Sequence, residues 1–145
     1  MATLDLDDLN DLMHLRVADL MTSNSVVVTV DASIEDAAHL LHANSISGLP
    51  VVDPLGALVG VISQTDIVCV TDSPVGRVVR TRPSGLRVGE LMSSPAITIP
   101  LTGSVHDAAR TMVDSRMHRL IATDDAGRPV GVLSAIDLVT LFFGP

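Results

Sequence analysis

This sequence of 145 residues contains no tryptophan and no tyrosine, and its only two phenylalanines, Phe142 and Phe143, stand at the C-terminal end. An aromatic platform on which a base could stack is therefore missing from the body of the chain. Any ring that binds here must be held by aliphatic side chains and by the backbone.

Cysteine and lysine are also scarce. Cys69 is the only cysteine, which excludes an intramolecular disulfide and a cysteine-based zinc cluster. All nine basic residues are arginine, against 17 acidic residues, so the net charge is -8 and the pI is about 4.7. Without a basic face, nucleic acid is not expected to be a partner.

No apolar run approaches the length of a membrane span, and residues 5–11 are acidic where a cleavable signal would need basic residues. We therefore expect no membrane association and a cytoplasmic location. A hydrophobic fraction of 47% and a mean hydropathy of +0.46 exclude the disordered class.

Charge is unevenly distributed along the chain. Residues 1–68 carry Arg16 against ten acidic residues, a net charge of -9, whereas residues 69–145 carry eight arginines against seven, a net charge of +1. An anionic ligand should therefore prefer the second half.

The chain repeats itself at a constant offset of 71 residues. Residues 17–68 align with residues 88–139 without a gap, and 17 of the 52 positions are identical. Chance similarity would not keep turns, caps and apolar positions in register over this length, so the sequence predicts a duplicated unit. One unit cannot cover both faces of its own sheet, so the two are expected to form one pseudo-symmetric module.

Within each copy the pattern predicts a strand, a helix, two strands and a final helix, which is an α/β (α+β) fold. In the first copy we expect strands at 26–30, 49–52 and 57–62, a helix that begins at Ser33 and is ended by Gly48, and a helix from Ser63 to about Val70. In the second copy we expect strands at 96–101, 120–123 and 129–133 and helices at 104–117 and 134–141.

An amphipathic lead-in helix is predicted over residues 3–16, with Thr3 as its N-cap and Leu6, Leu9 and Met13 on one face. Two interpretations remain open for this helix. It packs against the body of its own chain, or it contributes to a homodimer contact.

A long connection separates the copies and contains Arg77, Arg80 and Arg82. It is either a solvated loop or a flap whose arginines reach a phosphate. The expected domain organisation is an N-terminal helix at 1–16, a first repeat at 17–70, the connector at 71–87 and a second repeat at 88–141.

Several short motifs recur in a fixed order. They are Asp19-Leu20-Met21-Thr22 with Glu90-Leu91-Met92-Ser93, Leu49-Pro50-Val51-Val52-Asp53, Gly60-Val61 with Gly131-Val132, and the Ser-x-x-Asp ends at Ser63/Asp66 and Ser134/Asp137. In this order the chain resembles a tandem pair of CBS domains, called a Bateman module, over residues 17–140. The resemblance implies a stand-alone CBS-domain protein with two β-α-β-β-α repeats packed through their small sheets.

Members of this family bind adenine nucleotides or S-adenosylmethionine in clefts between paired repeats. The resemblance therefore implies AMP, ADP, ATP or S-adenosylmethionine as ligand, with no cofactor required. It implies that Asp66 and Asp137 accept hydrogen bonds from ribose hydroxyls and that Ser63 and Ser134 stand near a phosphate. The residues implied for nucleotide binding are Ser134, Asp137, His118, Arg119, Leu120, Ile121, Ala96 and Ile97, with a second site at Ser63, Asp66, Leu49, Pro50 and Val51.

Helix capping offers a second explanation of the Ser-x-x-Asp motif, which occurs four times. Each instance fits a helix N-terminus at which serine caps the orphan amides, worth about 1 kcal/mol. We interpret Ser33/Asp36 and Ser104/Asp107 as caps only. For Ser63/Asp66 and Ser134/Asp137 both roles remain open.

The two copies differ just before their second predicted strand. The second copy has His118-Arg119, and the resemblance implies that such a pair contacts phosphates, whereas the first copy has Ser47-Gly48. The second copy is therefore the primary candidate for phosphate binding. It also has Ile121-Ala122 where the first copy has Pro50-Val51, which leaves the identity of the base open.

Catalysis and metal binding are not expected. Cys69 has no evident partner, and His39 and His42 lack a third ligand. Two functions remain open. The first is a regulatory module that binds an adenosyl ligand and signals by conformational change to an unknown effector, and the second is a structural homodimerisation module with degenerate, ligand-free clefts.

Overall fold

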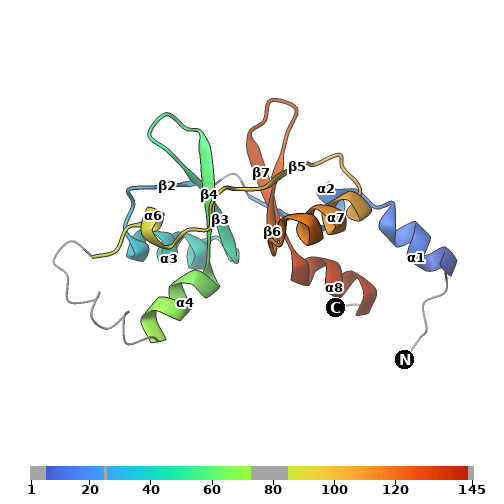
Figure 1. The fold of residues 1–145 in the computed structure, drawn as a ribbon, viewed down its shortest axis with the longest axis horizontal. Coiled ribbons are helices and arrows are strands. Elements are labelled where there is room, and N and C mark those ends of the chain that lie inside the picture. The colour runs from blue at the N-terminus through green and yellow to red at the C-terminus, as the bar shows by residue number, and fades with distance from the viewer. Residues whose placement is uncertain (1–5, 25, 73–84, 144–145) are drawn as a thin grey trace. The chain divides into compact units, whose positions relative to one another are not determined.

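The computed structural model describes residues 6–24, 26–72 and 85–143 (Figure 1). Thr3, Arg77, Arg80 and Arg82 lie outside these ranges. The chain divides into two compact units, one formed by residues 1–25 with 97–145 and the other by residues 26–96.

The unit formed by residues 26–96 is built on a three-stranded sheet. Its strands are β2 (Val28–Thr29), β3 (Gly48–Val52) and β4 (Leu58–Ser63), in the order β2-β3-β4. Strand β2 is parallel to β3, and helix α3 (Ile34–Ala43) makes the crossover that a parallel pair requires. Strand β4 returns antiparallel to β3 and is followed by helix α4 (Gln64–Asp72) and then by the short helix α6 (Val88–Leu91).

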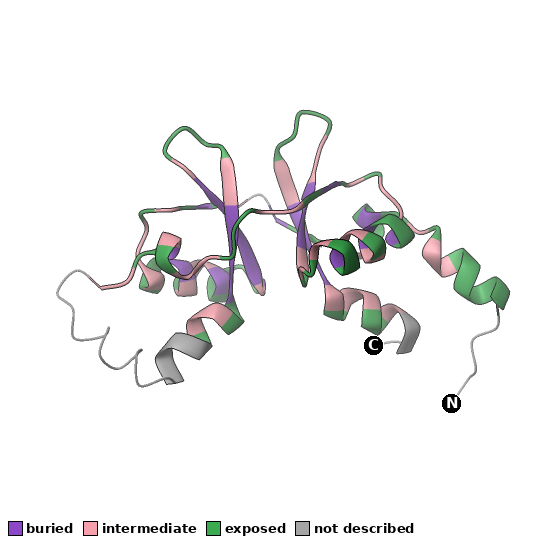
Figure 2. Ribbon diagram, in the orientation of Figure 1, coloured by how far each residue is buried: buried purple, intermediate pink, exposed green. Residues whose placement is uncertain are grey.

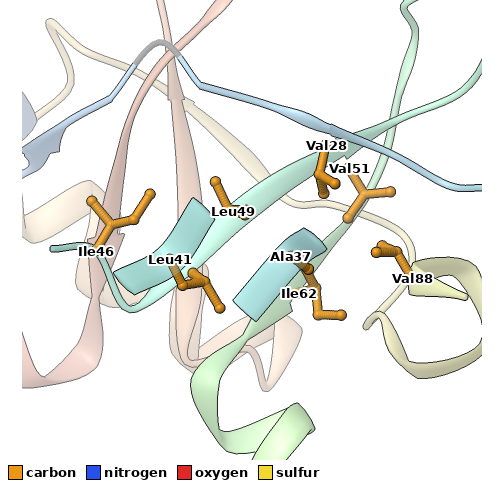
Figure 3. Close-up of a cluster of buried hydrophobic side chains, with 8 residues drawn as sticks. All are labelled: Val28, Ala37, Leu41, Ile46, Leu49, Val51, Ile62 and Val88. Carbon is orange, nitrogen blue, oxygen red and sulfur yellow. The ribbon is translucent and has the colours of Figure 1, made fainter. Parts of the chain in front are cut away.

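The core of this unit lies between the sheet and its helices, as Figure 3 shows. Alternate residues of β3 and β4 face the helices, because successive side chains of a strand point to opposite faces. The cluster consists of Val28, Ala37, Leu41, Ile46, Leu49, Val51, Ile62 and Val88.

The second unit contains a four-stranded sheet in the order β1-β7-β6-β5. The strands are β1 (Thr22–Ser23), β5 (Thr98–Pro100), β6 (Arg119–Thr123) and β7 (Pro129–Ser134). The helices are α1 (Leu6–Met13), α2 (Val17–Leu20), α7 (Val105–Ser115) and α8 (Ala135–Phe143). The core consists of Val17, Ile99, Ala108, Met112, Leu120, Ala122 and Leu133.

The stretch that opens each repeat joins the sheet of the other repeat. In the four-stranded sheet, Thr22 and Ser23 pair antiparallel with Val132 and Gly131. At the corresponding place in the other unit, the amides of Val61 and Ser93 each donate to the other's carbonyl, at 3.0 and 2.8 Å. A compact unit therefore combines most of one repeat with the opening segment of the other.

This exchange explains the glycine at the start of the repeated Gly-Val motif. A Cβ atom on Gly131 would lie 2.5 Å from Met21 Sδ and 2.9 Å from the carbonyl oxygen of Thr22. A Cβ atom on Gly60 would lie 2.7 Å from the carbonyl oxygen of Ser93. The glycines are needed because another strand backbone passes directly over them.

The predicted strands and helices occur in the predicted order, but β1, α2 and α6 were not predicted and some ends differ. Helix α3 stops at Ala43, so the prediction that Gly48 ends it was wrong. The backbone turns at Ser45, which has a φ of 53°, and Gly48 is the first residue of β3, opposite Ser63. Helix α7 likewise ends at Ser115, and Arg116 adopts the left-handed conformation with a φ of 57°.

No helix in the described ranges is long and apolar enough to cross a membrane.

Candidate functional site

The candidate site of the second repeat lies where the β6–β7 ladder ends and helix α8 begins. Arg119, the first residue of β6, lies directly opposite Ser134, the last residue of β7. The amide of Ala135, the first residue of α8, donates to the carbonyl oxygen of His118 at 2.7 Å. The structure thus brings His118, Arg119 and Ser134 together, with Asp137 in the first turn of α8.

Strand alternation separates these residues from the core. Leu120 and Leu133 face the helices and are fully buried in the core. Arg119, Ile121 and Ser134 therefore lie on the opposite face of the sheet. On an antiparallel ladder, directly opposed side chains have Cβ atoms about 5 Å apart, so Arg119 and Ser134 are neighbours on this face.

Ser134 and Asp137 form a reciprocal capping box at the start of α8. The amide of Ser134 donates to Asp137 Oδ2 at 2.8 Å, and the amide of Asp137 donates to Ser134 Oγ at 3.2 Å. With Ala135 bonded to His118, three amides at this helix end already have acceptors. The helix end therefore offers few free amides to an anion, and a bound phosphate must find its donors in side chains.

Arg119 is the side chain best placed to supply those donors. It is partly buried, and its Nε is fully buried without a hydrogen-bond partner among the described residues. A buried donor without an acceptor is costly, and the guanidinium group binds phosphate oxygens in two-pronged geometry. His118, which precedes it, is exposed.

The matching place in the first repeat has the same cap but no cation. The amide of Ser63 donates to Asp66 Oδ2 at 2.8 Å, and the amide of Asp66 donates to Ser63 Oγ at 3.2 Å. Gly48 lies opposite Ser63 where the second repeat has Arg119 opposite Ser134. The geometry of the two caps is the same, so the charged group that distinguishes the second place is the Arg119 side chain, with His118 beside it. The first place has Gln64 where the second has Ala135.

Most of the remaining candidate residues lie in or beside the core of their unit. The side chains of Leu120 and Ile97 pack in or against the core of their unit, and the carbonyl oxygen of Ile97 accepts the amide of Ile121 at 2.9 Å. Ala96 directly precedes Ile97 in the chain. In the first repeat, Leu49 and Val51 are core residues, and strand alternation puts the buried Pro50 on the other face.

The other two Ser-x-x-Asp motifs act as simple caps, as the sequence predicted. Ser33 Oγ accepts the amide of Asp36 at 3.0 Å, and Ser104 Oγ accepts the amide of Asp107 at 3.0 Å.

No group of three or more histidine, cysteine or acidic residues that could hold a metal ion occurs in the part of the chain that the structure describes.

Comparison with known proteins assigns the chain to a family. The family model for the CBS domain matches residues 17–71 and again residues 88–144. The chain therefore belongs to the CBS domain family and carries two copies of the domain. Modules of this family are generally non-catalytic.

Individual relatives agree with this assignment. A CBS domain-containing protein of Dictyostelium discoideum is 32% identical over 135 residues, which covers 89% of this chain and 92% of that protein. The CBS domain of a CBS domain-containing membrane protein from Sphaerobacter thermophilus superposes with a TM-score of 0.71 at 27% identity, covering 91% of this chain and 90% of that one. The crystal structure of CBSX2 in complex with AMP superposes with a TM-score of 0.62 at 31% identity, covering 86% and 92%.

Proposed function

We propose that this chain is a non-catalytic regulatory module that binds AMP, or a related ligand such as ADP, ATP or S-adenosylmethionine, through the Arg119–Ser134 end of its second repeat. The observation that carries the proposal is that Arg119 lies opposite Ser134 and that its buried Nε has no hydrogen-bond partner among the described residues. Arg119 as a whole is only partly buried, so its side chain would turn to bring Nε to a phosphate group, which would supply the missing acceptor.

The ribose would lie beside Asp137. Its Oδ2 is used by the cap, whereas Oδ1 accepts no hydrogen bond from a described residue. One carboxylate oxygen is therefore available to a ribose hydroxyl without loss of the cap. The AMP complex of CBSX2, which is 31% identical, supports an adenine nucleotide as the ligand class.

The second repeat would be the phosphate-binding copy. The first repeat presents Gly48 and Ser47 at the equivalent positions, so it would hold at most an uncharged part of the ligand. The same proposal includes phosphate contacts from Arg77, Arg80 and Arg82. These three residues lie outside the described ranges.

Binding would regulate through a shift between two conformations of the module that a partner protein distinguishes.

We also propose a homodimer, because the helices that follow β4 and β7 expose apolar side chains. Val68 is 53% exposed, Ile136 65% and Val139 47%. Exposed aliphatic surface on neighbouring turns of a helix is typical of an association surface.

The second candidate function is a structural homodimerisation module whose ligand places are degenerate. It is favoured by the two capping boxes, because capping alone accounts for Ser63, Asp66, Ser134 and Asp137. It does not account for the buried Nε of Arg119, for which the described part of the chain supplies no acceptor.

A thermal-shift panel with AMP, ADP, ATP, NAD and S-adenosylmethionine separates the two functions. A ligand at about 100 times its Kd should stabilise the fold by about 2.7 kcal/mol and raise the Tm by several degrees. We expect the phosphate-bearing adenine ligands to do so. The absence of a shift with every adenosyl compound at millimolar concentration would contradict nucleotide binding and favour the structural module.

A further inference from the structure

Helix α1 carries an apolar stripe that the described residues leave largely uncovered. Leu6, Leu9 and Met13 recur at helical spacing, yet no residue of α1 is buried, and Leu6 is 83% exposed. Figure 2 shows α1 as the helix whose surface is mostly exposed. The chain after it is held firmly, because the amide of Val105 donates to the carbonyl oxygen of Leu15 at 2.7 Å.

The stripe lines a hollow that the start of α7 completes. The hollow has a volume of about 520 Å³, and its walls include Leu6, Leu9 and Met13 from α1 and Ser104 and His106 from the start of α7. Leu6, Leu9 and Met13 form its apolar lining, and the polar lining consists of Asn10, His14, Ser104 and His106. Apolar side chains on one helix face beside polar ones are the kind of lining into which an amphipathic helix inserts apolar anchors.

Acidic residues border the hollow on α1. Asp7 and Asp11 flank the stripe on one side, because Asp7 lies three residues before Asn10, which lines the hollow, and Asp11 lies one turn after Asp7. Helix α1 carries no basic residue. Two arginines lie nearby: Arg16, which follows α1 and bridges to Ser104, donates through Nη1 to the carbonyl oxygen of Thr102 at 2.8 Å, and Arg110 of α7 is paired with Asp114 at 3.7 Å. The three aspartates of α1 outnumber Arg16, so this side of the hollow keeps a net negative charge.

The negative charge of α1 favours some binding partners for the hollow over others. Nucleic acid and anionic lipid surfaces would be repelled. A second copy of this chain would bring an equally acidic α1 against the first, and like charges in contact oppose association. A helix with apolar anchors and flanking Lys or Arg satisfies both the hollow and its border.

We propose that the hollow between α1 and the start of α7 is a docking site for a basic amphipathic helical segment of a partner protein. Apolar side chains of that segment fill the hollow beside Leu6 and Leu9, and its basic side chains face Asp7 and Asp11. The proposal does not depend on nucleotide binding, since none of its residues belongs to the Arg119–Ser134 site.

The probe is a fluorescein-labelled helical peptide of roughly 15 residues with Leu at helical spacing and Arg on the flanking positions. Its matched control keeps every Leu and replaces each Arg with Glu. We expect saturable binding of the basic peptide to the full chain by fluorescence anisotropy, weaker at about 0.5 M than at about 0.05 M salt, and no binding of the acidic peptide. Failure of the basic peptide to bind, or equal binding of both peptides, would overturn the proposal.

Variants locate the site. Leu9→Ser removes an apolar anchor and should weaken binding about tenfold or more, and Asp11→Asn should weaken it about threefold. Asp11 lies beyond the first turn of α1, so its neutralisation leaves the acidic start of the helix intact. The matched controls are Leu55→Ser, at a turn where Leu55 is 94% exposed, and Asp125→Asn in another exposed turn, and both should bind the peptide as the parent does.

Light scattering without peptide tests the rival occupant. If Leu9→Ser converted a dimer into a monomer, a second copy would occupy the hollow, and the proposal would be overturned. A circular dichroism spectrum that matches the parent shows that a variant is folded. Unchanged peptide affinity in a folded Leu9→Ser variant would also overturn the docking proposal.

Discussion

The carboxylate of Asp137 accepts the amide of Ser134 through Oδ2 at 2.8 Å, while Ser134 Oγ accepts the amide of Asp137 at 3.2 Å. Asp66 and Ser63 repeat this arrangement with the same two distances. The first repeat can therefore serve as a control for the second. The two caps are equal, but only in the second does an arginine lie opposite the serine.

Alanine substitution of the two aspartates should separate capping from ligand binding. Asp66→Ala and Asp137→Ala remove the same cap and should each cost about 1 kcal/mol of unfolding free energy. Only Asp137→Ala should also reduce the stabilisation by AMP, because Oδ1 of Asp137 is the proposed ribose acceptor. Chemical denaturation with and without AMP measures both effects. Equal loss of the AMP response in the two variants would contradict assignment of the ligand to the second repeat.

Replacement of Arg119 should have opposite effects on binding and on the unliganded fold. Within the described ranges the buried Nε of Arg119 has no hydrogen-bond partner, so Arg119→Ala should leave the unliganded stability unchanged or raise it. AMP affinity should fall about ten- to a hundredfold, because a charge-assisted hydrogen bond to phosphate is lost, while adenosine affinity should stay the same.

Isothermal calorimetry with AMP and adenosine tests this prediction. Arg128→Ala is the matched control, since Arg128 is an exposed arginine in the same repeat that pairs with Asp124 at 2.9 Å. Arg119→Ala that binds AMP as tightly as the parent would show that the phosphate lies elsewhere.

The turn between β6 and β7 should contribute less to the free energy of unfolding at acidic pH. The amide of Arg128 holds the pKa of Asp124 below its ordinary value of 3.8, and the Arg128 side chain adds to this effect. A carboxyl group with a lowered pKa in the folded state stabilises the fold above the ordinary pKa, and this contribution is lost as the pH falls through the folded pKa. Asp124→Asn should therefore flatten the stability profile below about pH 4. NMR titration of the Asp124 carboxyl measures the shift directly, and a midpoint at or above the ordinary value would contradict it.

Much of the fold could be predicted from the sequence because the duplication doubles each signal. The caps at Ser33 and Ser104 mark two helix starts, and the β-branched runs mark the strands. Helix ends were harder to predict. Ser45 and Arg116 end the helices in a left-handed conformation, which the sequence does not indicate because neither residue is glycine or asparagine.

The exchange of opening segments was not predicted, although the sequence contains a signal for it. Leu15-Arg16 and Leu86-Arg87 repeat at the same offset of 71 residues, just before the aligned region. In the structure, Arg16 Nη1 donates to the carbonyl oxygen of Thr102 at 2.8 Å, and Arg87 Nη1 to that of Asp31 at 3.4 Å. These are long-range contacts, and periodicity within a segment says nothing about which repeat a segment joins.

The candidate site was likewise predicted only in part from the sequence. Its residue types were predicted from the motif and the family resemblance, whereas their arrangement depends on strand register. A one-residue change of register would move Arg119 to the core face and Leu120 to the site. The use of Asp137 Oδ2 in a cap also required the structure, because the motif alone is compatible with both roles.

Gly131→Ala tests the packing that joins the opening segment to the second repeat. The added Cβ would lie 2.5 Å from Met21 Sδ and 2.9 Å from the carbonyl oxygen of Thr22, so either the methionine moves or β1 shifts away from β7. Such overpacking should cost about 1–3 kcal/mol of unfolding free energy. In a double-mutant cycle with Met21→Ala, the two changes should cost about 1 kcal/mol less together than their sum, because the shortened side chain removes one of the two clashes. The carbonyl clash remains in the double variant, so full rescue is not expected. Chemical denaturation of the four proteins measures the cycle, and strict additivity would show that Met21 does not lie against Gly131.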